Sequence, residues 1–121
     1  MIRIKLGQIL NSKDVLPKLL LSELRIKTIV KIERLLIKIQ KELEFIEKQH
    51  VELVKKYGET TDNSQWNVKA ENIQVFTSEF NELLDLEIEV AEVEKLDVNE
   101  IGNVVLDTKD YVLIKPYINV E

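Results

Sequence analysis

A heptad stripe through the middle of the chain constrains its fold more than any other feature. Its members follow one another at spacings of three and four, which places them on one seam of a helix. The seam comprises Ile32, Leu36, Ile39, Leu43, Ile46, His50, Leu53 and Tyr57. Lys55, Lys56 and Gly58 are typical of a helix C-terminus. The pattern predicts a helix over about residues 26–57 that cannot bury this seam without a second helix.

A second apolar flank runs beside the seam and widens the stripe. Its members are Ile26, Val30, Leu35, Ile37, Phe45, Val51 and Val54. A stripe of this width can contact two neighbours, which favours a small bundle over a two-stranded coiled coil. A second amphipathic helix at about residues 70–85 would supply one neighbour from the same chain. The alternative for that segment is a strand over 72–76, but the helical spacing continues through Leu84 and favours the helix.

Two short segments alternate apolar and charged residues and are predicted to pair as strands. Residues 2–6 place Arg3 and Lys5 on one face, and residues 86–90 place Glu87 and Glu89 on theirs. Pairing would set opposite charges across the ladder. With two helices and this small sheet, residues 1–121 are expected to form one α+β domain that is mainly α.

The intervening segments are less constrained by their patterns. Residues 8–21 fit a helix capped by Ser12 or one beginning near Leu16 with Pro17 in its first turn. Gly7 allows a change of direction after the first strand. Residues 58–67 have the composition of a polar surface loop. Further turns are expected to begin at Asp97 or Asn99 and at Asp107 or Thr108.

Composition and charge narrow the classes of function. The chain has no cysteine, which excludes disulfides and thiolate metal sites, and no stretch is apolar enough to span a membrane. We therefore expect a soluble cytoplasmic protein. The net charge of −5 divides into +7 over residues 1–41 and −12 over residues 42–121. Mutual neutralisation within one fold is the favoured interpretation, and complementary surfaces between molecules are the alternative.

Several side chains are candidates for binding. A basic face could contact phosphates: Arg25, Lys27, Lys31, Arg34 and Lys38. The region lacks aromatic residues for base stacking, which argues against readout of single-stranded nucleic acid. A solvated or intermolecular face that meets the acidic half is the favoured interpretation. Trp66 is equally consistent with a partner anchor and with burial against its own chain. His50 is expected to have a structural role on the seam, and the acidic run of residues 79–100 is expected to be a solvated face.

No nucleophile–base set, glycine-rich phosphate loop or metal-ligand spacing is present, so we predict neither catalysis nor a metal or cofactor. Assembly is the function that the heptad pattern favours. The seam from Ile32 to Tyr57 is the expected self-association surface, with His50 as its polar interruption. The chain is expected to form homo-oligomers, and nucleic acid is not an expected partner.

Three segments resemble small proteins of tailed bacteriophages and prophages. They are a helix end at residues 53–59 (LVKKYGE), residues 79–90 (EFNELLDLEIEV), and residues 106–111 (LDTKDY) leading to 115–118 (KPYI). The resemblance covers most of the chain, from about Leu16 onward. It implies a phage context, in the host cytoplasm or the virion, and brings no catalytic residues. Within that context we expect a non-enzymatic assembly protein, or alternatively an anti-defence protein that sequesters a nucleotide-like signal or inhibits a host defence protein.

Overall fold

A long helix organises the computed structural model, which describes residues 2–61, 65–102 and 104–119. The main helices and the longest strands were expected from the sequence, while several short elements were not. In chain order the elements are β1 (Ile2–Lys5), α1 (Leu6–Ser12), η1 (Leu16–Leu21), α2 (Ile26–Tyr57), β2 (Gly58–Thr60), β3 (Trp66–Val68), η2 (Ala70–Asn72), α3 (Ile73–Leu84), β4 (Glu87–Val90), β5 (Leu96–Asp97), η3 (Val98–Ile101), α4 (Thr108–Ile114), η4 (Lys115–Tyr117) and β6 (Ile118–Asn119).

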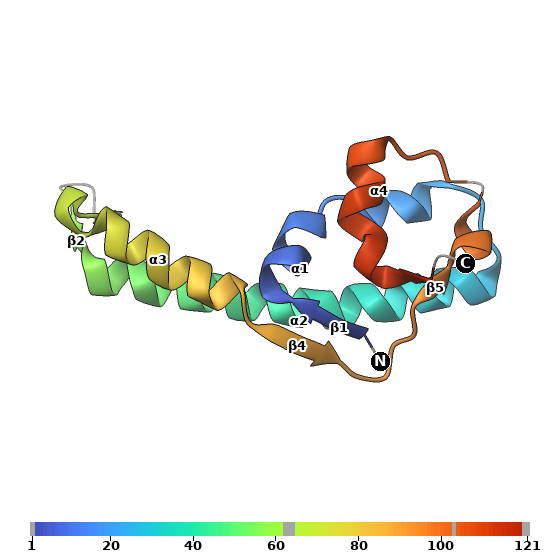
Figure 1. Ribbon diagram of the computed structural model, residues 1–121, viewed down its shortest axis with the longest axis horizontal. Coiled ribbons are helices and arrows are strands. Elements are labelled where there is room, and N and C mark those ends of the chain that lie inside the picture. Colours follow the sequence, from blue (N-terminus) through green and yellow to red (C-terminus); the bar gives the residue numbers. More distant parts are fainter. Residues whose placement is uncertain (1, 62–64, 103, 120–121) are drawn as a thin grey trace.

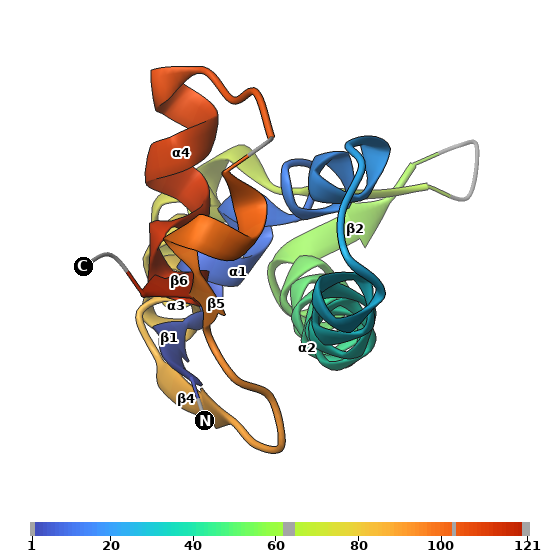
Figure 2. The same ribbon diagram turned by 90° about the vertical axis from the view of Figure 1, so that its right-hand side faces the viewer.

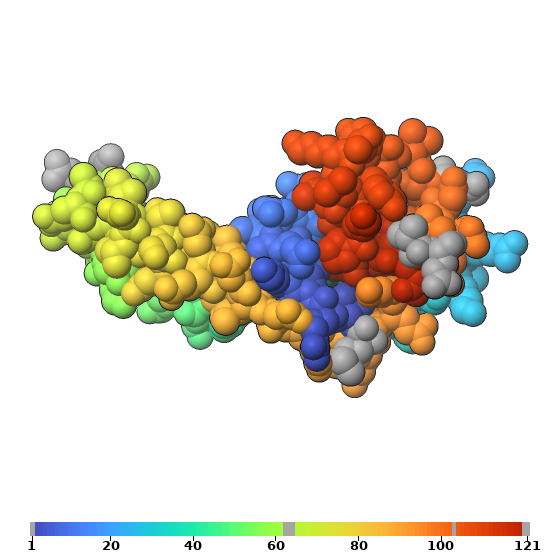
Figure 3. All heavy atoms as spheres, in the orientation of Figure 1, coloured from blue at the N-terminus to red at the C-terminus, as the bar shows by residue number. Residues whose placement is uncertain are grey.

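The molecule consists of a head and an arm that share α2 (Figure 1). In the head, α1, α4 and the β1–β4 pair gather around the N-terminal half of α2. In the arm, which we define as residues 42–85, the C-terminal half of α2 lies beside α3 and ends at the β2–β3 hairpin. The space-filling view shows the arm as a narrow projection from a broader head (Figure 3). The expected mainly α, α+β fold is confirmed, including the bounds of the long helix.

The β1–β4 pair has the register that the alternating charges predict. The strands are antiparallel, with Ile2 opposite Val90 and Arg3 opposite Glu89. The guanidinium of Arg3 lies 2.7 Å from the Glu89 carboxylate and 3.3 Å from that of Glu87. These side chains are exposed, so each pair is expected to add at most ~1 kcal/mol. The buried faces of Ile2 and Ile4 are therefore the main reason that the pairing is stable.

The interior of the head forms where α1, α2 and the C-terminal elements meet. Its fully buried side chains include Leu6, Ile9, Leu16, Leu19, Ile32, Leu35, Ile39, Leu96, Ile114 and Tyr117. One prediction placed Ser12 at the N-cap of a helix. In the structure it is instead the last residue of α1 and is buried in this interior. Its hydroxyl lies 3.1 Å from the Ile9 carbonyl and 2.7 Å from the Tyr117 hydroxyl. The buried polar groups are thus satisfied by each other.

Four local expectations for turns and loops can be compared with the structure. Gly7 lies inside α1 and does not form a turn, and an added Cβ there would make a tight contact of 3.1 Å with the Leu84 carbonyl oxygen. The alternative with Pro17 in the first turn of a short helix is confirmed, and Asp107 caps α4 by accepting a hydrogen bond from the Asp110 amide. The expected polar loop is instead the β2–β3 hairpin, and its residues 62–64 lie outside the described residues.

Alkaline pH is expected to destabilise the head through Tyr117. Burial raises the pKa of Tyr117 to about 12, although its hydrogen bond with Ser12 acts in the opposite direction. Since a phenol in an unfolded chain has a pKa near 10, the stabilising contribution is complete below about pH 10 and is lost as the pH rises through about 12.

The free energy of unfolding should therefore gain a slope of about −1.4 kcal/mol per pH unit between those values. Urea unfolding of the wild type and Tyr117→Phe at pH 8 to 12 measures this slope. Tyr117→Phe should lack the contribution, whereas Tyr111→Phe, which changes a half-exposed ring, should retain it. An equal slope in the wild type and Tyr117→Phe would contradict the assignment.

Candidate functional site

The heptad seam is covered within the chain. Ile32, Ile39 and Ile46 are buried, and the other five seam residues are half-buried. The head covers the N-terminal part of the seam and α3 covers the C-terminal part. The expected location of the self-association surface therefore needs correction, because a second copy could reach this seam only by displacing the protein's own elements.

An aromatic cluster holds α3 against the C-terminal half of α2. The ring of His50 lies edge-on to Phe76 and Phe80, with centroids 5.7 and 5.1 Å away, and the two phenylalanine rings stack at 6.4 Å. At the end of the arm, the Tyr57 hydroxyl donates a hydrogen bond of 2.7 Å to Glu79. That bond, with a smaller effect of Lys56, holds the pKa of Glu79 below its usual value. His50 and Tyr57 thus serve contacts inside the arm.

The opposite face of α2 carries exposed apolar residues, which we call the outer stripe: Ile26, Val30, Ile37 and Val51. Val30, Ile37 and Val51 share one heptad position, since seven and fourteen residues separate them. Ile26 and Ile37 expose 75% and 60% of their surface, and Val30 and Val51 expose 39% and 38%. These residues belong to the second apolar flank. Of the three other residues of that flank, Leu35 is buried, Val54 is half-buried and Phe45 is exposed.

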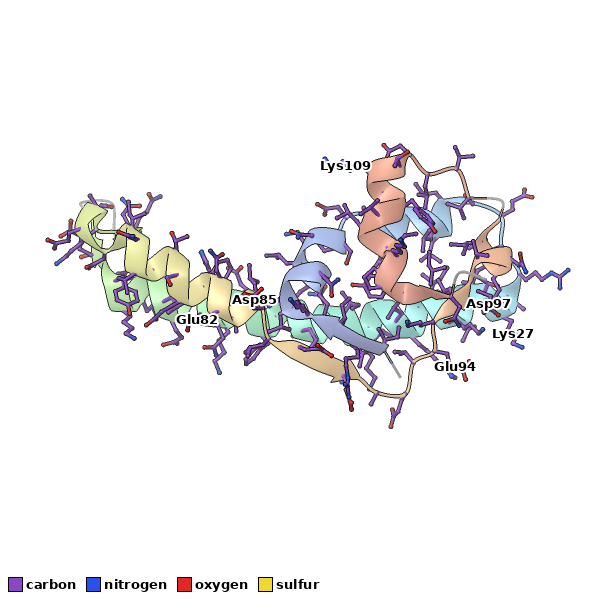
Figure 4. The ribbon with its side chains drawn as sticks, in the orientation of Figure 1. Lys27, Glu82, Asp85, Glu94, Asp97 and Lys109 are labelled. Carbon is purple, nitrogen blue, oxygen red and sulfur yellow. The ribbon has the colours of Figure 1, made fainter. Side chains whose placement is uncertain are left out.

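Four of the five predicted phosphate-binding residues line two separate cavities. Lys27, Lys31 and Arg34 line an open cavity of about 630 Å³ beside the N-terminal half of α2, which we call the α2 cavity. Its remaining lining consists of Ile26, Val30, Glu92, Val93 and Glu94. Arg25 lines a separate cavity of about 650 Å³ with Asp97 and Glu100 among its neighbours. Figure 4 shows Lys27 and Glu94 at the same end of the head.

Two of the five predicted phosphate-binding bases form ion pairs with carboxylates. The Lys31 ammonium lies 2.8 Å from Glu100, and the hydrogen bond between them raises the pKa of Lys31. Lys38 lies 3.6 Å from Glu92, whose backbone takes a left-handed conformation with φ 63° at the turn after β4. In the described part of the chain, Lys27 and Arg34 form no ion pair. The carboxylates of the α2 cavity were missed as site residues, because no local pattern brings residues 92–94 beside α2.

The charge division of the sequence is largely resolved within the molecule. Among the described residues, five of the six ion pairs join a base from residues 1–41 to an acid from residues 42–121. This agrees with the favoured interpretation of mutual neutralisation. The arm still contains four bases against ten acids, a net charge of −6, and the rest of the chain has a net charge of +1.

Trp66 lies at the end of the arm, in β3, where it pairs with Thr60 of β2. It keeps 43% of its surface exposed, so part of its side chain packs against its own chain and the rest is accessible to solvent. The side chain therefore presents a large amphipathic surface from a short, hydrogen-bonded hairpin.

Within residues 2–61, 65–102 and 104–119, no group of three or more His, Cys, Asp or Glu residues is arranged to hold a metal ion. No helix of that part combines the length and apolarity needed to cross a membrane. Comparison of the chain with protein-family models, curated proteins and solved structures found no match.

Proposed function

We propose that this protein is a non-enzymatic assembly protein that self-associates through the outer stripe of α2. The observation that carries the proposal is the exposure of Ile26, Val30, Ile37 and Val51 on one side of a helix whose opposite side is already covered. Ile26, Val30 and Ile37 lie within about three turns of one another on this side, and exposed apolar residues gathered in this way are typical of an interaction site. The occupant we propose is a second copy of the chain, packed along the same face.

Charge favours an antiparallel arrangement of the two copies. The N-terminal half of α2 and its cap, residues 25–41, carry six bases and one acid, whereas the arm carries the net charge of −6. Antiparallel pairing places the basic half of each helix against the arm of the other, and parallel pairing places like charges together. Around the outer stripe, Lys27, Arg34 and Lys41 are exposed in the basic half, and Glu44 and Glu52 are exposed in the arm.

A two-fold axis near the middle of α2 would make this contact twice. The 32 residues of α2 give a helix of about 48 Å, so each half offers roughly 24 Å of contact. The same surface is used by both copies, as in the isologous interfaces of most dimers. The resemblance to tailed-phage proteins supports a setting in an infected bacterium, as a virion component or as an accessory factor in the host cytoplasm.

A dimer is expected from size-exclusion chromatography with light scattering, and Ile37→Glu should shift it to a single chain. Ile37 is exposed at the centre of the stripe, so a carboxylate there should leave the helical circular dichroism unchanged while opposing apolar contact. Val112→Glu places the same charge at a similarly exposed residue of α4 and should remain dimeric. The mass of a single chain for the wild type at every concentration would reject the proposal.

The alternative function, capture of a nucleotide-like signal, has one observation in its favour: three predicted bases share the α2 cavity. The cavity also contains Glu92 and Glu94, and Lys31 already binds Glu100. A phosphate there would meet two carboxylates and would compete with Glu100 for Lys31. For this reason the geometry supports capture of an anionic ligand less well than self-association.

A further inference from the structure

We infer that the free edge of β4 is a docking site for an extended, basic segment of another protein, which binds as an additional strand. Among the described residues, β1 is the only strand that pairs with β4. Figure 2 shows β4 as the outer strand of this pair, with β1 between it and the rest of the head, and Figure 1 shows the same arrangement. This site is separate from the outer stripe and does not require self-association.

The main-chain groups of Glu87 and Glu89 point to this free edge. In an antiparallel pair, residues that exchange main-chain hydrogen bonds alternate with residues whose amides and carbonyls point away from the partner strand. The Leu6 amide donates a hydrogen bond of 3.0 Å to the Leu86 carbonyl, one position beyond the paired residues and in the same register. Ile88 therefore also faces β1, and its two neighbours in β4 turn their main-chain groups outward.

The hydrogen bonds around the strand pair agree with this orientation. Lys5 lies opposite Glu87, and its amide turns away from β4 and donates a hydrogen bond of 2.9 Å to the side chain of Gln8. Within the described residues, no other main-chain group bonds to the outward amides and carbonyls of Glu87 and Glu89. An open strand edge of this kind can bind a further strand through main-chain hydrogen bonds.

Charge selects a basic segment for this edge. Residues 85–94 contain five acids and no base. Arg3 contacts both Glu87 and Glu89, yet the side chains of these two acids remain 51% and 49% exposed. In an added strand, the residues opposite Glu87 and Glu89 would lie on the same face of the sheet. Basic side chains at those positions would pair with the two carboxylates from the side that Arg3 leaves open.

The strand that already pairs with β4 shows which sequence pattern fits. β1 places Arg3 and Lys5 on the exposed face of the sheet and apolar residues on the buried face. An added strand with the same alternation would set bases beside Glu87 and Glu89 and apolar side chains beside the half-buried Ile88. The β4 strand of a second copy fits less well, because antiparallel pairing would place its acids against the same carboxylates.

Amide hydrogen exchange followed by NMR tests the docking directly. The probe is a short peptide, capped at both ends, that alternates Arg or Lys with Ile. At about ten times its dissociation constant, it should slow exchange of the Glu87 and Glu89 amides about tenfold, because these amides then exchange only from the free protein. The Ile88 amide, which faces β1, should change less than about twofold.

Two results of this titration would overturn the inference. One is unchanged exchange of the Glu87 and Glu89 amides at about 1 mM peptide, since a site weaker than this has no useful affinity. The other is faster exchange of Ile88 with no slowing at Glu87, which would mean that the peptide replaces β1 and leaves the free edge empty.

Two modified peptides separate strand pairing from attraction by charge alone. Methylation of the peptide amides that face β4 keeps the charge and removes the donors, so it should weaken binding more than about tenfold. Replacement of the bases by Glu keeps the donors and should also weaken binding about tenfold, because each cross-strand pair changes from attraction to repulsion. Equal binding of the methylated and unmethylated peptides would contradict strand addition.

Glu89→Pro and Glu89→Ala form a matched pair of protein variants. Both lack the carboxylate, but only proline lacks the amide, and this amide points away from β1. Glu89→Pro should therefore bind the basic peptide more than about tenfold less tightly than Glu89→Ala. Circular dichroism checks that both are folded. Equal binding by two folded variants would overturn the inference, and the methylated peptide supplies the same comparison on the wild type if Glu89→Pro does not fold.

Self-association is measured separately, so the two proposals can fail independently. Ile37→Glu is expected to be a single chain and should bind the peptide with the same dissociation constant as the wild type, because the residue lies outside β4. Slower exchange of Glu87 and Glu89 as the protein concentration rises, without peptide, would identify a second copy as the occupant of the edge. That result would overturn docking of another protein, whatever the outer stripe does.

Discussion

Ile39→Ala is expected to lower the free energy of unfolding by about 2–5 kcal/mol, the largest effect predicted for a single residue of α2. Ile39 is 2% exposed and packs in the interior of the head. Shortening it removes apolar contacts and leaves a cavity that the surrounding helices can close only in part. Since these contacts lie within one chain, the loss should be the same in dilute and in concentrated protein. Urea unfolding at two concentrations measures it.

The matched control is Ile37→Ala, which makes the same change two residues away on the opposite face. Ile37 is 60% exposed, so its replacement should alter the unfolding free energy of the dilute protein by no more than ~0.5 kcal/mol. In concentrated protein, Ile37→Ala should also reduce the gain in stability that comes from association. Equal costs for the two variants in dilute protein would mean that the seam and the outer stripe have been assigned to the wrong faces.

Gly58→Ala is expected to destabilise the end of the arm by about 1–3 kcal/mol, because it overpacks a tight backbone junction. An added Cβ would lie 2.7 Å from the Asn67 carbonyl oxygen and in still closer contact with the carbonyl oxygen of Val54. Both obstacles are backbone atoms, so no side-chain rotation relieves them. The φ of Gly58 is −112°, and the requirement for glycine is therefore steric and not conformational.

Hydrogen exchange can locate this effect. The Lys69 amide, bonded to the Tyr57 carbonyl, and the Thr61 amide, bonded to that of Gln65, should lose protection in Gly58→Ala while the amides of the head retain it. Gly102→Ala is the control, since its nearest heavy atom to an added Cβ is 3.7 Å away, an ordinary contact. Unchanged protection of both amides in Gly58→Ala would contradict the predicted clash.

The regular elements could be predicted because their patterns are local. The seven-residue spacing of Ile32, Ile39 and Ile46 indicates a helix, whichever segment of the protein covers that seam. The alternation of Arg3 and Lys5 against Glu87 and Glu89 indicated a partner as well as a strand, since opposite charges label the two edges. Ser12 was misassigned because a cap and a buried hydroxyl share the same local pattern, and only its contact with Tyr117 distinguishes them.

The candidate site was less accessible to sequence reasoning. Three of the five predicted bases, Lys27, Lys31 and Arg34, line one cavity, but the acidic residues around them were not predicted. Glu92, Glu94 and Glu100 reach this face only after the chain has passed through the arm and back along β4. Patterns over the length of one helix or strand do not indicate contacts between segments this far apart in the sequence.

The sequence by itself determined that this protein has a long amphipathic helix with more apolar surface than one neighbour can cover. The periodicity of apolar side chains is set by residues close together in the sequence, so it does not depend on how the rest of the chain folds. Only the tertiary structure decided which of the two apolar faces stays exposed. The head and α3 cover the heptad seam from Ile32 to Tyr57, and the outer stripe from Ile26 to Val51 stays exposed. The physical reason is that burial depends on contacts between distant segments, which local spacing does not specify.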